Sequence, residues 1–282
     1  MNKKLVFIFV LLLTIALAAC GGGKEVEGCL GTAEGAIVDL DCREITFAVE
    51  NAYLPFNYVS LDTGEAEGWD YDVFNEVCVR LHCKPVYVEA AWDGMIQAVA
   101  DGQFDMAGDG ITITDDRAEI VDFSDGYISL EQRLLVRLGE DRFSSMEEFA
   151  AGDFVIGTQT GTTNYETAIL YLPEERINAF ETFPFAVQSL IAGDVDAVII
   201  DDVAGQGYMG ENADKVELVG PSIESQWLGF IYPLGSDLVD PVNQALAAMK
   251  ADGFLASVNL KYFGPDFTIT YDDIGPGAYG DE

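Results

Sequence analysis

The sequence predicts an α/β protein of two lobes. Short apolar segments that fit strands alternate with amphipathic segments that fit helices, and this alternation occurs in two successive series along the chain. The chain has 282 residues, 49% of them hydrophobic, which suffices for the core of one large domain or of two smaller ones. The repetition of the series favours two lobes, each built on a mostly parallel sheet.

The first series of predicted elements runs from residue 45 to residue 107. In its first helix Val73, Val77 and Leu81 recur at helical spacing, which places them on one face. The order strand, helix, strand, helix, strand is typical of a parallel sheet. The predicted strands are 45–50, 86–89 and 104–107, and the predicted helices are 70–81 and 94–100.

The second series repeats this order and is followed by a closing strand and helix. Ser144 and Glu147 match a capping box that would open a helix. A strand at 229–232 and an amphipathic helix at 237–251, with Gly253 as its stop, complete the chain. The remaining predicted elements are strands at 134–138, 154–157 and 197–201 and a helix at 184–192.

The first twenty residues fit a secretory signal that ends in a lipobox. Two lysines precede an apolar run at 5–13, which is short for a membrane span, and the segment ends in Leu17-Ala18-Ala19-Cys20. We expect a signal peptide at 1–19 and a lipid on Cys20 that anchors the protein to the outer face of the cytoplasmic membrane. The alternative is an uncleaved anchor, and both place the folded part outside the cytoplasm. Residues 20–43 are then a lipidated tether and lead-in loop.

Export changes the interpretation of the other cysteines, because disulfides persist outside the cytoplasm. The four cysteines allow three pairings, and local spacing favours Cys29 with Cys42 and Cys78 with Cys83. Zinc is the competing interpretation, but His82 is the only histidine and the spacings are not those of a zinc site. We therefore expect two disulfides and no metal.

Composition and residue types exclude several classes of function. The 49 acidic and 14 basic residues give a net charge of −35, which argues against nucleic acid as a partner. A catalytic triad would have to use His82 as its base, and a structural histidine is the simpler interpretation. The chain has no glycine-rich phosphate loop, and 62–68 lacks the regular oxygen ligands of a calcium loop. We expect no catalytic residues and no cofactor.

The segment Gly110-Ile111-Thr112-Ile113-Thr114-Asp115-Asp116-Arg117 is typical of a carboxylate-binding site. Gly110 lets the backbone approach a ligand, and Thr114 is a candidate N-cap for a helix that opens with two acids. Arg117 would supply a planar pair of donors that matches a carboxylate. The alternative is that Thr114 only caps a helix and Arg117 pairs with a neighbouring acid.

The order of motifs resembles that of solute-binding protein family 3, the extracytoplasmic receptors for polar amino acids in ABC importers. The resemblance covers about residues 44–265. Its motifs are Tyr53-Leu54-Pro55-Phe56, Gly68-Trp69-Asp70-Tyr71-Asp72, Trp92-Asp93-Gly94-Met95-Ile96, 110–117, Asp122-Phe123-Ser124-Asp125, Gly161-Thr162-Thr163, Asp196-Ala197-Val198 with Asp201-Asp202, and Tyr262-Phe263-Gly264.

The resemblance implies a two-lobe fold of the periplasmic-binding-protein type, type II, in which two crossover segments form a hinge. By analogy the hinge lies at 129–131 and 225–227. Lobe 1 is then discontinuous, with residues 44–128 and 228–268, and lobe 2 has residues 132–224. Residues 269–282 form an acidic tail.

The family also implies how an amino acid would be held. Arg117 would bind the α-carboxylate with the amides of Thr112 and Thr163 and the side chain of Thr162. The α-ammonium would lie between the Gly110 carbonyl, the Thr112 hydroxyl and Asp201. A buried zwitterion needs both charges matched, which supports this assignment. Asp202 is an alternative to Asp201.

The side-chain end of the implied site is aromatic and acidic. Tyr53 and Trp92 would form its walls, with Phe56 and Tyr71 as alternatives to Tyr53. The selectivity residues at this end are Glu50, Asp109, Gln159 and Ile200. The two acids among them, Glu50 and Asp109, suggest that the ligand is arginine, lysine or ornithine, while a polar neutral amino acid such as glutamine remains open.

The implied partners are a free amino acid and an ABC permease, for which a monomer is expected. Two alternatives use the same fold. Some relatives are cyclohexadienyl dehydratases, in which Glu50 or Asp109 would have to act as an acid. A sensor for a membrane kinase would share the binding residues and differ only in its partner.

Overall fold

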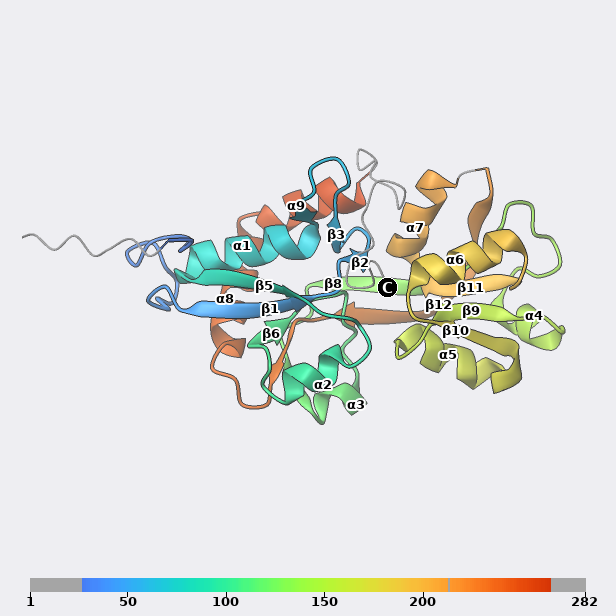
Figure 1. Cartoon of the computed structure of the whole chain (residues 1–282), viewed down its shortest axis with the longest axis horizontal. Helices are drawn as coiled ribbons and strands as arrows, with labels where there is room; N and C mark the ends of the chain where they lie inside the picture. Colours follow the sequence, from blue (N-terminus) through green and yellow to red (C-terminus); the bar gives the residue numbers. More distant parts are fainter. Residues whose placement is uncertain (1–26, 213, 265–282) are drawn as a thin grey trace, which may run out of the picture.

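The chain forms two lobes, each built around a five-stranded sheet, which lie side by side along the long axis of the molecule (Figure 1). The computed structural model describes residues 27–212 and 214–264. The predicted signal peptide, Cys20 and the predicted tail at 269–282 lie outside the described residues. None of the described helices is long and apolar enough to cross a membrane.

Lobe 1 contains a sheet of order β5-β1-β6-β13-β7, in which β1 runs parallel to β5 and β6 and β13 runs antiparallel to its two neighbours. A small sheet of β2 (Ala52–Tyr53), β3 (Asn57–Val59) and β4 (Ala66–Glu67) lies beside it. The main strands are β1 (Glu44–Val49), β5 (Lys84–Glu89), β6 (Met106–Ala107), β7 (Val121–Phe123) and β13 (Ile231–Pro233). The helices are α1 (Trp69–Leu81), α2 (Met95–Ala100), α3 (Asp115–Ala118), α8 (Val239–Ala251) and α9 (Phe254–Phe263).

Strand β1 is apolar at Ile45 and from Phe47 to Val49, because helices cover both faces of its sheet. Phe47 and Val49 belong to the cluster that includes α1, α8 and α9, whereas Ala48 belongs to the cluster around Met95 and Val99 of α2. Alternate residues of a strand point to opposite faces, so a continuous hydrophobic run serves both clusters. This double coverage fixes the end of β1, where Glu50 follows.

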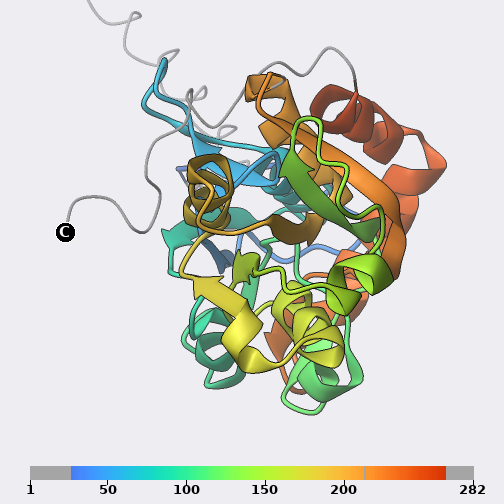
Figure 2. The ribbon, with the colours of Figure 1, turned by 90° about the vertical axis from the view of Figure 1, so that its right-hand side faces the viewer.

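Lobe 2 contains a sheet of order β10-β9-β11-β8-β12, in which β9 is parallel to β10 and β11, and β8 is antiparallel to β11. Figure 2 views the molecule from the end of this lobe. The strands are β8 (Ile128–Arg137), β9 (Ile156–Gln159), β10 (Ile177–Phe180), β11 (Ala197–Asp201) and β12 (Val216–Leu228). The helices are α4 (Met146–Ala151), α5 (Thr163–Tyr171), α6 (Phe183–Ala192), α7 (Asp202–Glu211) and the 3₁₀ turn η1 (Glu174–Arg176).

Strands β8 and β12 connect the two lobes as one antiparallel pair. Their register runs from Ile128 opposite Leu228 to Arg137 opposite Val216, with an irregularity between Val219 and Glu224. The predicted hinge segments, 129–131 and 225–227, face each other within this pair. The Ile113 amide donates to the Trp227 carbonyl at 2.8 Å, which ties the connecting strands to lobe 1.

The predicted capping box is wrong by one residue. The N-cap of α4 is Ser145, whose hydroxyl accepts from the Glu148 amide, and Glu148 accepts at 2.8 Å from the Ser144 amide and at 2.9 Å from its hydroxyl. The helix begins at Met146 because Met146 and Phe149 are the residues that reach the core. With the helix starting at Met146, Ser145 is the N-cap residue, and the side chain of Glu148 rather than Glu147 reaches back to the helix start.

The four cysteines lie in the two pairs that local spacing favours. The sulfur atoms of Cys29 and Cys42 are 2.14 Å apart, and those of Cys78 and Cys83 are 2.11 Å apart. The second pair joins the end of α1 to the residue before β5. His82 lies near the first pair, and its Nδ1 is 2.8 Å from an Asp39 carboxylate oxygen.

Candidate functional site

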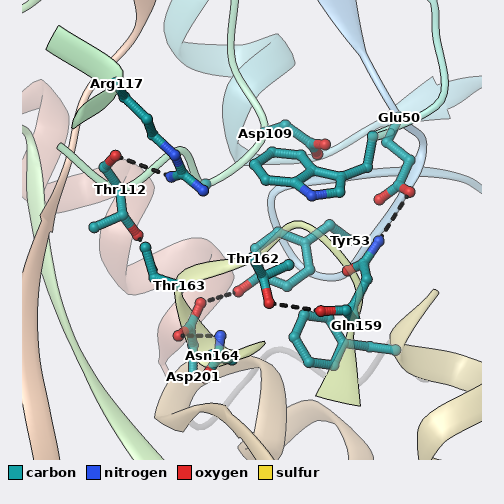
Figure 3. Close-up of a pocket in the computed structure, with 13 residues that line it drawn as sticks. Glu50, Tyr53, Asp109, Thr112, Arg117, Gln159, Thr162, Thr163, Asn164 and Asp201 are labelled. Carbon is teal, nitrogen blue, oxygen red and sulfur yellow. Dashed lines mark hydrogen bonds between the residues drawn. The ribbon is translucent and has the colours of Figure 1, made fainter. Parts of the chain in front are cut away.

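A pocket lies where the two lobes meet, lined by residues of both (Figure 3). All eleven ligand-binding residues that the sequence predicts line it, and two further residues, Asn164 and Phe183, do so as well. Lobe 1 contributes Glu50, Tyr53, Trp92, Asp109, Gly110, Thr112 and Arg117, and lobe 2 contributes Gln159, Thr162, Thr163, Asn164, Phe183 and Asp201.

Arg117 lies at one end of the pocket, on the short helix α3. Thr114 caps this helix, since its hydroxyl accepts from the Arg117 amide at 3.2 Å. The guanidinium donates to the Thr112 carbonyl at 3.0 Å and to the Gly161 carbonyl of the other lobe at 3.4 Å. Its central carbon is 5.5 Å from the ring of Trp92. These contacts hold the guanidinium across the boundary between the lobes.

The charge of Arg117 is buried without a carboxylate partner. The residue is 9% exposed, and among residues 27–212 and 214–264 no acid forms an ion pair with it. Burial lowers the pKa of Arg117, although Glu166 and Asp201 oppose the shift. Arginine stays charged in proteins, and a buried charge is costly until it is paired. The alternative prediction, a surface arginine paired with a neighbouring acid, is therefore wrong.

Gly110 allows the aromatic wall to approach the backbone. Its φ of +59° lies in the left-handed region, and a β-carbon there would lie 2.5 Å from the Tyr53 ring. Tyr53 stacks between Phe56, at 5.4 Å, and Phe183 of lobe 2, at 5.9 Å. Of the three aromatic residues proposed for this wall, Tyr53 lines the pocket. Phe56 stacks on the Tyr53 ring, and the Tyr71 hydroxyl donates to the Asn51 side chain.

The start of α5 forms the lobe 2 side of the pocket. The Thr162 hydroxyl is the N-cap, since it accepts from the Tyr165 amide at 3.2 Å and donates to the Gln159 carbonyl at 2.8 Å. Thr163 begins the helix, so its amide is one of the donors that a helix start leaves without an intrahelical partner. This helix end can therefore receive an anionic group.

Asp201 lies at the end of β11, where two donors hold its carboxylate. The Tyr53 hydroxyl donates to Oδ2 across the lobe boundary, and the Asn164 amide donates to Oδ1 at 3.1 Å. Burial raises the pKa of Asp201, and both hydrogen bonds oppose the rise. The neighbouring Asp202 instead accepts from the Glu131 amide at 3.1 Å, on a connecting strand. Of these two adjacent acids, Asp201 therefore lines the pocket and Asp202 does not.

The opposite end of the pocket from Arg117 is acidic (Figure 3). The Gln159 amide donates to the Glu50 carboxylate at 3.2 Å and to the Glu181 carbonyl at 2.9 Å. Asp109 is 3% exposed and accepts from Asn57 at 2.7 Å, while its Oδ2 has no partner among the described residues. Burial raises the pKa of Asp109 to about 7. This end is suited to a cation or a strong hydrogen-bond donor.

The predicted selectivity residue Ile200 is not in the pocket. It is completely buried in a hydrophobic cluster with Val198 and Val187. Successive residues of β11 point to opposite faces, so the strand that directs Asp201 into the pocket directs Ile200 into the core. The sequence contains this signal, because the two residues are adjacent in a predicted strand.

Three residues that shape the site were not predicted. Asn164 directs an amide to Asp201, and Phe183 covers Tyr53. Asn57 lies behind the pocket and donates to both Asp109 and the fully buried Asp70, at 2.7 and 2.9 Å. No local sequence pattern distinguishes these residues from ordinary core or helix positions.

Comparisons with known proteins agree with the two-lobe fold. The profile of bacterial extracellular solute-binding proteins, family 3, matches residues 45–265. The L-cystine-binding protein TcyA of Bacillus subtilis is 29% identical over 94% of this chain and 99% of its own length. An ancestral arginine-binding protein bound to glutamine is 30% identical with a TM-score of 0.73, covering 78% of this chain and 98% of that one. The arginine-, lysine-, histidine-binding protein ArtJ of Geobacillus stearothermophilus is 29% identical with a TM-score of 0.73, covering 79% and 96%.

Proposed function

Because this chain belongs to the bacterial extracellular solute-binding proteins of family 3, we propose that it captures a free amino acid between its lobes and delivers it to an ABC permease. The observation that carries the proposal is Arg117, a buried cation without a carboxylate partner among the described residues, in a pocket that also holds Asp201. An α-amino acid supplies the anion for the first and the cation for the second. The three similar proteins reported above bear the names of binding proteins, which supports a non-enzymatic role.

In this proposal Arg117 and the amides at Thr112 and Thr163 hold the α-carboxylate. The Gly110 carbonyl, the Thr112 hydroxyl and Asp201 hold the α-ammonium. Both charges of the zwitterion are then paired inside the pocket, which offsets their loss of hydration. The Tyr53 and Trp92 rings enclose the carbon chain between the two ends.

We propose that the ligand is cationic: arginine, lysine or ornithine. Among the described residues, Glu50, Asp109 and Asp201 line the pocket together with a single cation, Arg117. A zwitterion with a cationic side chain brings one net positive charge to this acidic surplus, and the free Oδ2 of Asp109 offers it an acceptor. Glutamine is the neutral competitor, because Gln159 and Glu50 can also bind an amide group.

A thermal-shift screen of the chain against the twenty amino acids and ornithine tests this proposal. A cationic ligand at about one hundred times its Kd should raise Tm by roughly 5–10 °C. Glu50→Gln should weaken arginine binding about tenfold and leave glutamine binding within about twofold, whereas the exposed Glu175→Gln should change neither. A response to neutral amino acids alone would contradict the cationic assignment and keep the receptor. Silence to every amino acid would contradict the receptor itself.

The pKa of Asp109 predicts that arginine binding depends on pH. Because the pKa of Asp109 is raised, the folded protein holds a proton on this carboxyl between about pH 4 and 7, where the unfolded chain has released it. The contribution of Asp109 to the free energy of unfolding is therefore fully present below about pH 4 and is lost as the pH rises through 7. A cationic side chain favours the charged form of Asp109, so binding expels the proton. We expect arginine affinity to rise from pH 6 to pH 8. Calorimetry at pH 6.5 in two buffers of different ionisation enthalpy should detect the release, and Asp109→Asn should abolish it.

The delivery step requires the lobes to move. We propose that residues 129–131 and 225–227 act as the hinge between lobe 1 (44–128 with 228–268) and lobe 2 (132–224), and that the ligand stabilises the closed form that a permease recognises. A lipid on Cys20 would keep the receptor near its permease and raise the effective concentration. We further propose a monomer with both cysteine pairs oxidised, as expected outside the cytoplasm.

A further inference from the structure

Four polar side chains meet at the rear of the pocket and join both lobes to the connecting strands. Gln226 comes from β12, Gln132 from β8, Thr112 from lobe 1 and Thr163 from lobe 2. The Gln226 side-chain oxygen accepts from the Thr112 hydroxyl at 3.1 Å, from the Thr163 hydroxyl at 2.8 Å and from the Gln132 amide at 3.4 Å. Gln132 also donates to the Thr163 hydroxyl at 3.2 Å.

The acceptor at the centre of this cluster fixes the direction of the two threonine hydroxyls. The two hydroxyl oxygens are 3.4 Å apart, but the Gln226 side-chain oxygen is nearer to each of them, at 3.1 and 2.8 Å. Because an amide oxygen can only accept, each hydroxyl donates its single proton to Gln226. Thr112 is 5% exposed and lines the pocket, so the hydroxyl can offer a ligand only its lone pairs. Gln132, 1% exposed, donates to both Gln226 and Thr163 and so holds the two side chains together. The pocket wall at Thr112 is therefore a hydrogen-bond acceptor, although a threonine hydroxyl alone can either donate or accept.

We propose that Gln226, held by Gln132, is a positioning residue that makes this wall of the pocket an acceptor and thereby selects ligands with an α-ammonium group. The inference rests on the proposed function, because it concerns how the amino acid is chosen. A molecule with the carboxylate and side chain of the amino acid but no α-ammonium has no proton to give to Thr112. Since the four residues come from both lobes and both connecting strands, the acceptor wall is complete only when the lobes are together.

The binding test uses the full chain, arginine and 5-guanidinopentanoic acid, which lacks only the α-ammonium group. Gln226→Met keeps the size of the side chain and removes the acceptor. We expect it to weaken arginine binding about tenfold and to leave the deaminated analogue within about twofold, as measured by calorimetry or by competition. Gln226→Glu, which retains an acceptor, should keep arginine within about threefold, and the exposed Gln188→Met should change neither ligand. Glutamine and glutaramic acid replace the pair if the chain binds neutral amino acids.

A second test needs no ligand. Thr163→Val and Gln226→Met each remove one side of the same hydrogen bond, so their effects on Tm should be less than additive. We expect each single variant to lower Tm by roughly 2–4 °C. The decrease in Tm of the double variant should be smaller than the sum of the two single decreases. Additive losses would overturn the inference, and so would equal losses of arginine and analogue in Gln226→Met. A wild-type chain that binds no amino acid would instead contradict the proposed function, which the first titration reveals before any variant is made.

Discussion

Replacing Arg117 with alanine should abolish amino acid binding, with a loss of at least about a hundredfold in affinity. The guanidinium is the one cation that lines the described pocket, so a carboxylate placed there would be buried without its partner. Breaking a buried ion pair from one side costs about 3–5 kcal/mol, which corresponds to a factor of roughly 150 to 5,000. Isothermal titration with the best ligand from the screen measures the loss.

Arg117→Lys separates charge from geometry. Lysine retains the positive charge but lacks the planar pair of donors, and it cannot span the Thr112 and Gly161 carbonyls in the same way. We expect it to recover only part of the affinity. Arg43→Ala is the matched control, because Arg43 is 38% exposed and pairs with Asp237 at the surface. Unchanged binding in Arg117→Ala, in a chain that melts as the wild type does, would refute the assignment of Arg117.

The sequence places the ends of β1 and β11 to within one residue, because both depend on local patterns, whereas β8 begins six residues before its predicted start and β9 ends two residues after its predicted end. Strand β11 matches its predicted range, and Glu50 and Asp201 follow or end apolar strands whose cores are fixed by hydrophobic alternation. Thr114 caps α3 as its residue type predicts. Where an apolar run stops at a polar residue, the parallel sheet directs that residue toward the edge where sites form.

The connecting strands could not be predicted in the same way. Strand β12 is partly exposed along most of its length and contains Gly220 and Pro221, so it lacks the alternation that identifies a strand. It pairs with β8 because the two lobes require two crossings, which is a property of the whole fold. Gln132 and Gln226 acquire their contacts from that pairing. For the same reason Asn164 could not be predicted, because its role depends on where α5 meets β11.

The second large effect is expected at Asp201. Asp201→Asn should weaken amino acid binding about a hundredfold or more, because the α-ammonium loses the carboxylate that pairs with it. In the free protein two changes oppose each other. Burial raises the pKa of Asp201, so removing the charge relieves the fold, but an asparagine cannot accept from both Tyr53 and Asn164 as the carboxylate does. We therefore expect the Tm without ligand to stay within about 3 °C of the wild-type value.

The adjacent Asp202→Asn is a sensitive control for this prediction. Asp202 has the same residue type and follows directly in the chain, but its carboxylate bonds to the Glu131 amide on a connecting strand and does not line the pocket. Calorimetry should therefore find ligand affinity within about threefold of the wild type in Asp202→Asn and a large loss in Asp201→Asn. Equal losses would mean that both acids act through the connecting strands, and that the α-ammonium binds elsewhere. A loss of affinity in Asp201→Asn alone would support Asp201 as the residue that binds the α-ammonium. Because Asp201 also accepts a hydrogen bond from Tyr53 of the other lobe, the same residue would then both bind the ligand and hold the lobes together.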